Sequence, residues 1–220
     1  MKNNRYELKY LTLPVLFDKL ASSLSLSNFL YFEKFPKRKV HSLYFDLPNS
    51  KCLNDINFGS ISKFKVRARW YNNDPSKTFL EIKKKDALVG SKIVIDLGAI
   101  CFNDWKHFHQ TLLAKTNSYP QYHPFFGNPV VYVSYDRNYF CSMIMDYEKI
   151  RITLDRNVEY STCSLIGNSL TFNKTAKDHN MVVELKFPTE QIKEAASISR
   201  ILDLTLCKNS KFFNAIQSLR

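Results

Sequence analysis

The sequence predicts an α+β fold, in which a mainly antiparallel β-sheet, closed or strongly curved, has helices packed outside it. Many segments alternate apolar and polar residues with the period of two that is typical of strands. Most connections between them are short, as expected between antiparallel neighbours. No Pro/Gly/Ser-rich linker, fixed-period repeat or low-complexity tract divides the chain, so we expect a single domain over residues 1–220.

The predicted elements follow one another along the chain. Pro14 opens the first helix, because proline is favoured in the first helical turn, and turn residues separate strands at 72–76 and 86–90. Roughly nine strands are predicted, over residues 4–11, 38–47, 62–71, 77–85, 91–97, 127–140, 143–147, 149–155 and 181–187. Helices are predicted over residues 13–24 and 102–115 and within 189–219.

The chain is strongly basic. Its 220 residues include 32 Lys and Arg against 20 Asp and Glu, which gives a formal net charge of +12. Such an excess indicates a polyanionic partner: a nucleic acid, a phosphate-rich small molecule or an anionic membrane. The hydrophobic content of 45% is enough to build a core and argues against disorder.

The expected compartment follows from three features of the sequence. No apolar run approaches the roughly 18 residues of a membrane span. The N-terminal residues lack the apolar region of a signal peptide. The five cysteines are scattered without a C-x-x-C pair, as is typical of reduced thiols. We therefore expect a cytoplasmic protein with no membrane span in this chain.

Residues 63–71, KFKVRARWY, carry the most informative pattern. Lysines and arginines occupy every second position, and mostly apolar residues fill the positions between. Successive side chains of a strand point to opposite faces, so one face of this strand is cationic. Like charges in a row repel one another, and a strand that simply faces water usually mixes charge signs.

The same alternation recurs in five further segments, and Glu-x-Lys occurs at Glu7, Glu81 and Glu184. One interpretation is an open sheet with a solvated polar face. The other is a closed barrel lined by cations and a few carboxylates, which needs an anion inside. A linear polyphosphate or a nucleoside triphosphate supplies that anion, and carboxylates suit an accompanying divalent metal. The residues on these faces are Arg5, Glu7, Lys9; Phe79, Glu81, Lys83, Lys85; Tyr135, Arg137, Tyr139; Arg151, Thr153, Asp155; Val182, Glu184 and Lys186.

Eight segments in order resemble the VTC domain: RYELKYL, SLYFDLP, KFKVRARWY, FLEIKKKD followed by SKIVI, VSYDRNYF, RITLDRNV, VVELKFP and KNSKF. This family is the polyphosphate polymerase domain of the vacuolar transporter chaperone complex, and it also occurs as free-standing bacterial proteins. It belongs to the CYTH-like triphosphate tunnel metalloenzymes. The resemblance, over residues 5–213, implies an antiparallel barrel that binds triphosphate inside. It also implies a C-terminal helix at one tunnel end, with Phe212, Ile216 and Leu219 packed inward.

The resemblance also implies roles for individual residues. Glu184 matches the carboxylate that holds the catalytic divalent ion. Arg67 and Arg69 match the arginines that grip phosphate, which a planar guanidinium can do in bidentate fashion. The further catalytic positions implied are Lys83, Arg137 and Arg151. The implied phosphate-binding positions are Lys9, Lys65, Lys92, Lys186, Lys208, Ser210 and Lys211; Ser210 can also cap the last helix.

One position departs from the pattern of the wider superfamily. That pattern often begins Glu-x-Glu-x-Lys, whereas the first position here is Arg5. Glu7 and Glu184 are therefore the main candidates for metal ligands, with Glu81 next. Glu81 is better explained as an ion-pair partner of Lys83 or Arg67. Asp46 and Asp155 suit turn or supporting roles better than metal binding.

The predicted activity is transfer of the γ-phosphate of ATP to a growing polyphosphate chain, with Mn²⁺ or Mg²⁺. Phosphoryl transfer needs positioning and charge stabilisation more than a protein nucleophile. The partners expected are ATP and inorganic polyphosphate, with no specific nucleic acid; a membrane protein for export is a further possibility, and the sequence does not give the oligomeric state. Two alternatives stay open: a tripolyphosphatase or nucleoside triphosphatase of the same fold, and a non-catalytic polyphosphate or RNA binder. The second uses Trp70, Tyr71 and Tyr139 as stacking platforms, although packing is the more common role of strand aromatics.

Overall fold

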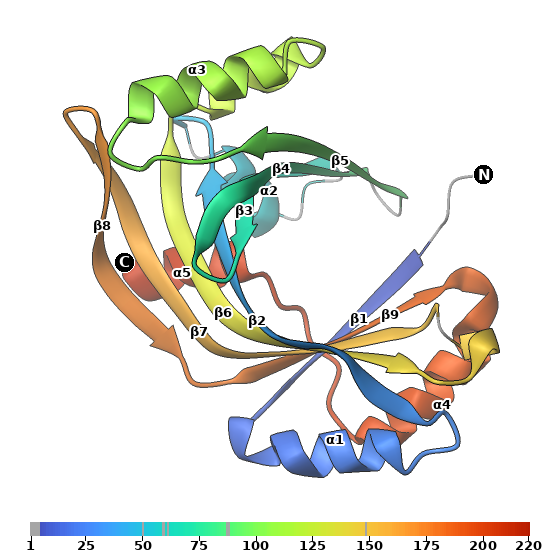
Figure 1. Cartoon of the computed structure of the whole chain (residues 1–220). Coiled ribbons are helices and arrows are strands. Elements are labelled where there is room, and N and C mark those ends of the chain that lie inside the picture. The colour runs from blue at the N-terminus through green and yellow to red at the C-terminus, as the bar shows by residue number, and fades with distance from the viewer. Residues whose placement is uncertain (1–4, 50, 59, 61, 87–88, 148) are drawn as a thin grey trace. The chain divides into compact units, whose positions relative to one another are not determined.

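The computed structural model describes residues 5–49, 51–58, 60, 62–86, 89–147 and 149–220. Residues 87–88 of the turn predicted at 86–90 lie outside these ranges. The strands are β1 (Arg5–Thr12), β2 (Tyr31–Phe45), β3 (Ser62–Tyr71), β4 (Asp74–Asp86), β5 (Val89–Gly98), β6 (Pro129–Ser142), β7 (Arg151–Ile166), β8 (Ser169–Asp178) and β9 (Met181–Pro188) (Figure 1). The helices are α1 (Phe17–Ser25), α2 (Lys51–Asn57), α3 (Trp105–Lys115), α4 (Ile192–Leu202) and α5 (Lys211–Leu219), with short 3₁₀ turns η1 (Pro14–Leu16), η2 (Pro120–Phe125), η3 (Met145–Tyr147) and η4 (Thr189–Gln191).

The strands form one large sheet. Its hydrogen-bonded order is β1-β9-β7-β6-β2-β3-β4-β5, with β8 beside β7. The strand pairs whose register is described (β1–β9, β2–β3, β3–β4, β4–β5 and β7–β9) are all antiparallel. The predicted α+β class and antiparallel sheet are therefore confirmed. This order runs as a path from β1 to β5, so closure of the sheet into a barrel stays a prediction.

The chain divides into two compact units. Unit 1 comprises Met1–Arg38, Tyr135–Val158 and Asp178–Ser210, and unit 2 comprises Lys39–Ser134, Glu159–Lys177 and Lys211–Arg220. The long strands β2, β6 and β7 contribute residues to both units. The expectation of a single domain over 1–220 stays a prediction.

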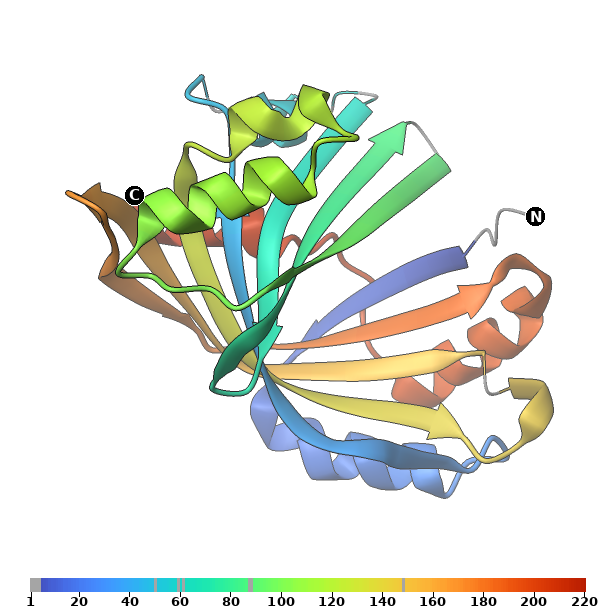
Figure 2. The same ribbon diagram turned by 45° about the horizontal axis from the view of Figure 1, so that its top comes forward.

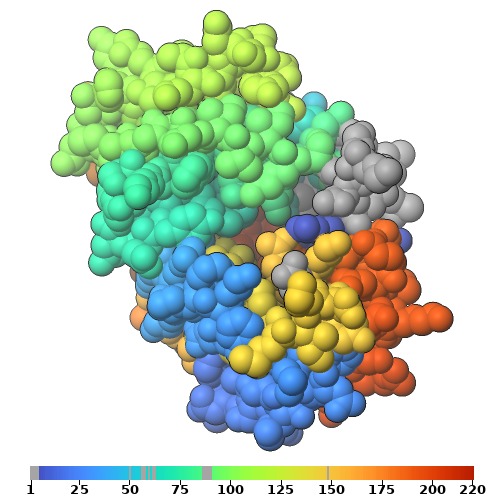
Figure 3. Space-filling view, turned by 45° about the vertical axis from the view of Figure 1, so that its right-hand side comes forward, coloured from blue at the N-terminus to red at the C-terminus, as the bar shows by residue number. Residues whose placement is uncertain are grey.

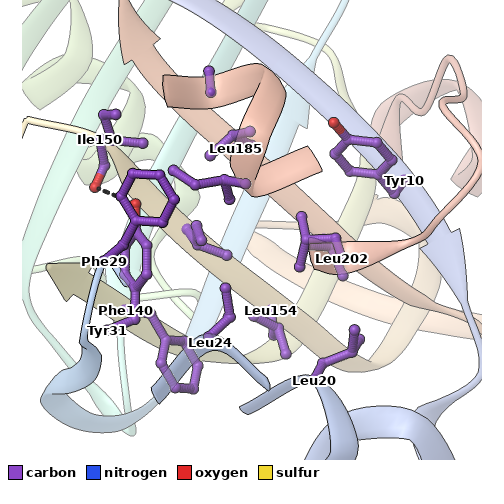
Figure 4. Close-up of a cluster of buried hydrophobic side chains, with 14 of the residues drawn as sticks. Tyr10, Leu20, Leu24, Phe29, Tyr31, Phe140, Ile150, Leu154, Leu185 and Leu202 are labelled. Carbon is purple, nitrogen blue, oxygen red and sulfur yellow. Dashed lines mark hydrogen bonds between the residues drawn. The ribbon is translucent and has the colours of Figure 1, made fainter. Parts of the chain in front are cut away.

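The core of unit 1 lies between the apolar face of its strands and two amphipathic helices. In α1, Leu20 and Leu24 are buried, and in α4 the buried residues include Ile198 and Leu202. These side chains pack against strand residues such as Leu154 and Leu185, as the close-up shows (Figure 4). The hydroxyl of Tyr31 donates to the backbone oxygen of Ile150 at 3.5 Å. Because both helices cover this face, the polar residues of the same strands lie on the opposite face.

Helix α3 and the turn η2 contribute buried aromatic side chains to unit 2, among them Phe108 and Tyr122. Helix α3 begins after Asp104, whose side chain accepts a hydrogen bond from the backbone N–H of His107, and it lies along β5 (Figure 2). Its Trp105 contacts the ring of Phe45 from β2. Trp70 is 4% exposed and stacks on His41 with ring centroids 5.2 Å apart. Trp70 is thus a packing residue, as the more common role of strand aromatics predicts.

Several predicted elements differ from the structure. Residues 143–147 were expected to form a strand but include the 3₁₀ turn η3, and the prediction missed α2 and β8. The helical region predicted within 189–219 is two helices, because α4 ends at Leu202 and the capping residue that follows, Asp203, has a positive φ of 48°. Strand β2 begins seven residues before the predicted start, at Tyr31.

The early part of β2 carries the basic run KFPKRK, residues 34–39. Residues 32–37 are exposed, and Figure 3 shows this light-blue segment at the surface. Pro36 has no N–H to donate to a neighbouring strand, and the lysines beside it discourage pairing with another chain. The expected solvent exposure of this run is confirmed for those residues.

No helix in the described ranges combines the length and the apolar character that a membrane crossing requires.

Candidate functional site

The cationic face predicted for residues 63–71 lies in unit 2. Residues directly opposite one another in neighbouring antiparallel strands share a face, so the strand register brings side chains from β2, β3, β4 and β5 together. We call the charged members the arginine cluster: Lys65, Arg67, Arg69, Glu81, Lys83 and Lys92.

Glu81 is the centre of the arginine cluster. Its Oε2 accepts hydrogen bonds from Nε of Arg67 at 2.8 Å and from Nη2 of Arg67 at 2.5 Å. The same oxygen lies 3.7 Å from Nη1 of Arg69, and Oε1 accepts from Nζ of Lys92 at 2.7 Å. The expected ion pair between Glu81 and Arg67 is therefore confirmed.

Glu81 is ionised over a wide pH range. Its side chain is buried, and burial alone would raise the pKa of the carboxyl. The charges of Arg67 and Arg69 and the hydrogen bond from Lys92 outweigh burial, and they hold this pKa well below the ordinary 4.5. The carboxylate of Glu81 thus serves as the counter-charge of Arg67 and Arg69.

Two neutral side chains of β2 orient the arginines. The hydroxyl of Tyr44 accepts a hydrogen bond from Nη1 of Arg67 at 2.9 Å. The hydroxyl of Ser42 accepts one from Nε of Arg69 at 3.1 Å. Tyr44 also packs on Phe212 of α5, with ring centroids 5.3 Å apart. Arg67 is thus held by Glu81 through Nε and Nη2 and by Tyr44 through Nη1.

Tyr44 titrates in an unusual range. It is 4% exposed, and burial alone would raise the pKa of its phenol. The charges of Arg67, Arg69 and Lys65, with the hydrogen bond from Arg67, instead lower this pKa to about 8. The shift shows how strongly positive this face is. The arginine cluster as defined holds five cations and one carboxylate, which suits a polyanionic ligand.

A second charged group lies on the polar face of unit 1. We call it the carboxylate cluster: Glu7, Lys9, Arg137, Asp155, Glu184 and Lys186. With three cations and three carboxylates it is balanced, unlike the arginine cluster. It is thus the group in which carboxylate oxygens are gathered.

Glu184 is the buried centre of the carboxylate cluster, at 5% exposed. Its Oε2 accepts a hydrogen bond from Nζ of Lys186 at 2.9 Å, and its Oε1 lies 3.6 Å from Nζ of Lys9. The ammonium of Lys9 also lies 3.1 Å from Oε1 of Glu7. Glu7 and Glu184 therefore share one ammonium group, which places the two predicted metal ligands in the same neighbourhood.

Arg137 joins the two buried carboxylates of this cluster. Its Nε and Nη2 donate to the two oxygens of Asp155 at 2.5 and 2.7 Å, and Nη2 also donates to Oε2 of Glu184 at 3.3 Å. Burial lowers the pKa of Arg137, but Asp155, Tyr135 and Glu184 raise it above its ordinary value. This arginine stays charged and holds Glu184 in place. Asp155 has the supporting role that the sequence indicated.

The KNSK segment lies along β1. The backbone N–H of Cys207 donates to the backbone oxygen of Lys9 at 2.8 Å, and Nζ of Lys9 donates to the backbone oxygen of Asn209 at 3.0 Å. Lys208 and Ser210, two of the predicted phosphate-binding residues, are thus the sequence neighbours of the residue that binds Lys9. Ser210 directly precedes α5, and Lys211 is its first residue. Arg151, an exposed residue, lies opposite Lys186 in the register.

Comparison with known families decides the assignment. The VTC domain profile matches residues 2–220. The chain belongs to the VTC domain family.

Solved structures show the same fold at low sequence identity. One, a protein of Vibrio parahaemolyticus provisionally named an adenylate cyclase, is 11% identical with a TM-score of 0.56, and the match covers 99% of each chain. Another, the PH1819 protein of Pyrococcus horikoshii OT3, is 16% identical with a TM-score of 0.54, over 97% of this chain and 98% of that one. No curated protein matches the sequence.

The carboxylate cluster contains the carboxylate oxygens that a divalent cation would need as ligands. Within the described ranges, no three His, Cys, Asp or Glu side chains gather as a ready-made metal centre. Mg²⁺ and similar ions commonly take one or two carboxylates and complete their shell with water and substrate phosphates. Glu7 and Glu184, which share the ammonium of Lys9, fit that pattern.

Sequence reasoning missed the neutral residues that orient the arginine cluster. Ser42 and Tyr44 have the alternation of a shared face in the segment SLYF. Their contacts with Arg67 and Arg69 depend on the register between β2 and β3, which joins distant parts of the chain. The alternation in the sequence indicates that Ser42 and Tyr44 share a face. The sequence alone does not give the register that brings them to the arginines.

Proposed function

We propose that this VTC domain is a polyphosphate polymerase that transfers the γ-phosphate of ATP to the end of an inorganic polyphosphate chain. The closed tunnel implied by the family resemblance is part of this proposal. The arginine cluster binds phosphate oxygens, and the carboxylate cluster holds Mn²⁺ or Mg²⁺. The observation that carries the proposal is the oriented, strongly positive arginine cluster in a chain of the VTC family.

The arginine cluster supports binding of an extended polyanion. Lys65, Lys83 and Lys92 lie opposite one another on β3, β4 and β5, beside Arg67 and Arg69. Guanidinium groups match phosphate oxygens in bidentate geometry, and ammonium groups act as point charges. Because Glu81, Ser42 and Tyr44 already orient the arginines, little side-chain entropy is lost when phosphate binds.

The carboxylate cluster supports the chemistry. Glu184, positioned by Arg137 and Lys186, and Glu7 would hold the divalent ion, which supplies charge stabilisation for the transferred phosphoryl group. Lys9 and Lys186 neutralise the carboxylates until substrate binds. A divalent ion alone meets repulsion from these lysines, so we expect its binding to be strengthened by triphosphate.

In the proposed step, a terminal oxygen of the polyphosphate chain attacks the γ-phosphorus of ATP. A new P–O bond forms there, and the bond from the γ-phosphorus to the oxygen that bridges it to the β-phosphorus breaks. ADP leaves with the electron pair of that bond. The chain residues contribute by aligning the phosphates in line and by stabilising charge.

The test is incubation of the protein with ATP and Mn²⁺, with polyphosphate read on a stained gel and free phosphate measured in the same sample. Polymer that disappears in Arg67→Ala and in Glu184→Gln supports the proposal and both site assignments. Lys193→Ala, a change of an exposed residue of α4, is the matched control and should leave polymer unchanged. Free phosphate without polymer would instead mean a triphosphatase, and neither product would mean a polyphosphate binder.

A further inference from the structure

The hydroxyl of Thr153 is a buried polar group without a hydrogen-bond partner. Thr153 is 6% exposed, and its Oγ1 contacts no donor or acceptor within the described part of the chain. Buried hydroxyls are nearly always paired, because leaving one unpaired costs about 1–3 kcal/mol. Each exception calls for an explanation, and an ion bound at the group is one of those known.

The position of Thr153 indicates which ligand is missing. Thr153 lies directly opposite Glu184 in the β7–β9 register, so both side chains lie on the same face. Asp155, two residues further along β7, shares that face and binds Arg137. The unpaired hydroxyl thus lies beside the carboxylate that the proposed function assigns to the metal.

The neighbouring charges favour a cation over a phosphate at this hydroxyl. Glu184 lies across the strands from Thr153, and Asp155 and the exposed Arg151 lie two residues along β7 on either side of it; the two buried groups among these are carboxylates. A phosphate would be repelled by them, whereas a hard divalent cation is attracted and takes hydroxyl oxygens as ligands. A Ser or Thr hydroxyl holds Mg²⁺ in the same manner in P-loop NTPases.

We propose that the Thr153 hydroxyl is a further oxygen ligand of the divalent cation held by Glu184, directly or through one of the cation's water molecules. The inference rests on the proposed function, because it uses the same metal site. It also explains why a β-branched polar residue, and not valine, stands at a buried strand position. The hydroxyl is kept at a cost to the stability of the metal-free protein.

A second unpaired oxygen lies in the same unit. Asn209 is 9% exposed, and its Oδ1 has no partner in the described residues. The backbone oxygen of Asn209 binds the ammonium of Lys9, which also contacts Glu184. Replacing Asn209 therefore serves as a control in the experiment described next. It tests whether removal of any unpaired oxygen near Lys9 lowers the affinity for Mn²⁺.

The experiment compares Thr153→Val, Thr153→Ser, Asn209→Ala and Glu184→Gln with the wild-type chain. Thermal unfolding is measured without ligand, with Mn²⁺, with inorganic tripolyphosphate, and with both. Binding of Mn²⁺ is measured directly by the loss of its free EPR signal. None of these readouts requires turnover of ATP.

For Thr153→Val we expect a melting temperature without ligand equal to or above that of wild type, because valine fills the same volume without an unpaired hydroxyl. We expect Mn²⁺ affinity to fall about tenfold, while stabilisation by tripolyphosphate alone is unchanged. Thr153→Ser should bind Mn²⁺ as wild type does. Wild-type Mn²⁺ affinity in Thr153→Val, or a lower melting temperature without ligand, would overturn the inference.

The control variants separate this inference from the proposed function. Glu184→Gln should lose Mn²⁺ binding, and if it does not, the metal assignment of the proposed function is wrong. If Glu184→Gln loses binding and Thr153→Val keeps it, only the role of Thr153 fails. An equal loss of Mn²⁺ affinity in Asn209→Ala and Thr153→Val would also overturn the inference as stated, because the effect would then not be specific to Thr153.

Discussion

The hydroxyl of Tyr44 accepts a hydrogen bond from Nη1 of Arg67 at 2.9 Å, on the side of the guanidinium away from Glu81. Tyr44 comes from β2, Arg67 from β3 and Glu81 from β4, so neighbouring strands fix one arginine. An arginine side chain that is free to rotate loses entropy when it binds phosphate, and this arrangement removes much of that cost. Tyr44 is therefore a positioning residue for Arg67.

Replacing Tyr44 by phenylalanine removes the hydroxyl and keeps the ring that packs on Phe212. We expect roughly tenfold weaker binding of tripolyphosphate at pH 7, because a hydrogen bond to a charged group contributes about 1.5 kcal/mol. Isothermal titration calorimetry measures the affinity. The free energy of unfolding, measured by urea titration, should change by less than the free energy of tripolyphosphate binding changes. A Tyr44→Phe variant with wild-type affinity would show that the hydroxyl does not position Arg67.

The same variant tests the titration of Tyr44. Its pKa of about 8 means that a phenolate forms as pH rises through 8 and places a negative charge beside Arg67. Wild-type affinity for tripolyphosphate should then fall about fivefold between pH 8 and 9 relative to Tyr44→Phe, because the protonated fraction of a group with this pKa falls from about one half to about one tenth. Protonation of tripolyphosphate itself affects both proteins equally. Since this pKa is below that of an unfolded tyrosine, the phenolate adds stability as pH rises from 8 to 10.

Absorbance at 295 nm follows the phenolate directly. Wild type should show a tyrosinate that titrates near pH 8 and is absent in Tyr44→Phe. Bound tripolyphosphate should move this titration to higher pH, because the ligand opposes a second negative charge. An identical titration in the two proteins would contradict the assignment of the low pKa to Tyr44.

Glu81 holds together the cations of its cluster, and its removal should cost stability. In Glu81→Gln, Arg67 and Arg69 lose their counter-charge, and we expect the free energy of unfolding to fall by about 3 kcal/mol at pH 7. Because the pKa of Glu81 is depressed, the difference from wild type should persist down to pH 4.5 and shrink below it. Urea unfolding of both proteins across this pH range shows whether the difference in stability shrinks as the pH falls.

Tripolyphosphate provides the control for Glu81→Gln. A bound polyanion supplies the missing counter-charge, so it should raise the melting temperature of Glu81→Gln more than that of wild type. Equal stabilisation of the two proteins would indicate that the ligand binds elsewhere. This outcome would also remove the arginine cluster from the proposed function.

The alternation of the strands is the feature of the sequence that predicts which residues belong to the two charged clusters. A period of two assigns Arg67, Glu81 and Glu184 to polar faces without knowledge of the fold, and the resemblance adds their roles. The sequence indicated Arg67 as one of two ion-pair partners of Glu81, and the two residues do lie on neighbouring strands with a short connection. Side-chain contacts between two strands that follow one another in the sequence are predictable, since a short turn fixes the register of the two strands.

The parts that were missed depend on non-local pairing or on exposure. The early half of β2 and the whole of β8 are largely exposed, so they lack the apolar alternation that identifies a half-buried strand. The contact of Tyr44 with Arg67 depends on the pairing of β2 with β3, across an intervening helix. An unpaired hydroxyl such as that of Thr153 has no signature in a sequence, because its distinguishing feature is the absence of a partner.

Asp155 should be necessary for the fold of unit 1 as well as for its chemistry. It is fully buried and binds Arg137 through both oxygens. In Asp155→Asn the buried guanidinium loses its main counter-charge, so we expect a loss of about 3 kcal/mol in the free energy of unfolding. Binding of Mn²⁺ should also weaken, because Arg137 positions Glu184.

Asp136→Asn is the matched control for Asp155→Asn. Asp136 makes the same type of ion pair with Lys37, at 3.5 Å, but the lysine is 54% exposed. Exposed pairs contribute about 0.5 kcal/mol, so this variant should be close to wild type in stability and in Mn²⁺ binding. Similar losses in both variants would mean that burial of the Arg137 pair is not the cause.

Lys83 and Lys84 test whether the polar face of β4 is the phosphate-binding face. The two lysines are adjacent, so their side chains point to opposite faces of the sheet. Lys83 lies opposite Lys65 and Lys92. Lys84 is on the other face, where its Nζ lies 5.7 Å from the ring centroid of Phe64. Each change to alanine removes the same charge. We expect Lys83→Ala to weaken polyphosphate binding about fivefold, as the loss of about 1 kcal/mol of charge interaction requires. Lys84→Ala should stay within twofold of wild type. Fluorescence anisotropy with labelled polyphosphate, at low and at high salt, measures the affinity of each variant. The difference in affinity between the two variants should become smaller at high salt, because salt screens the charges. Equal weakening by the two variants would mean that net charge, and not this face, governs binding.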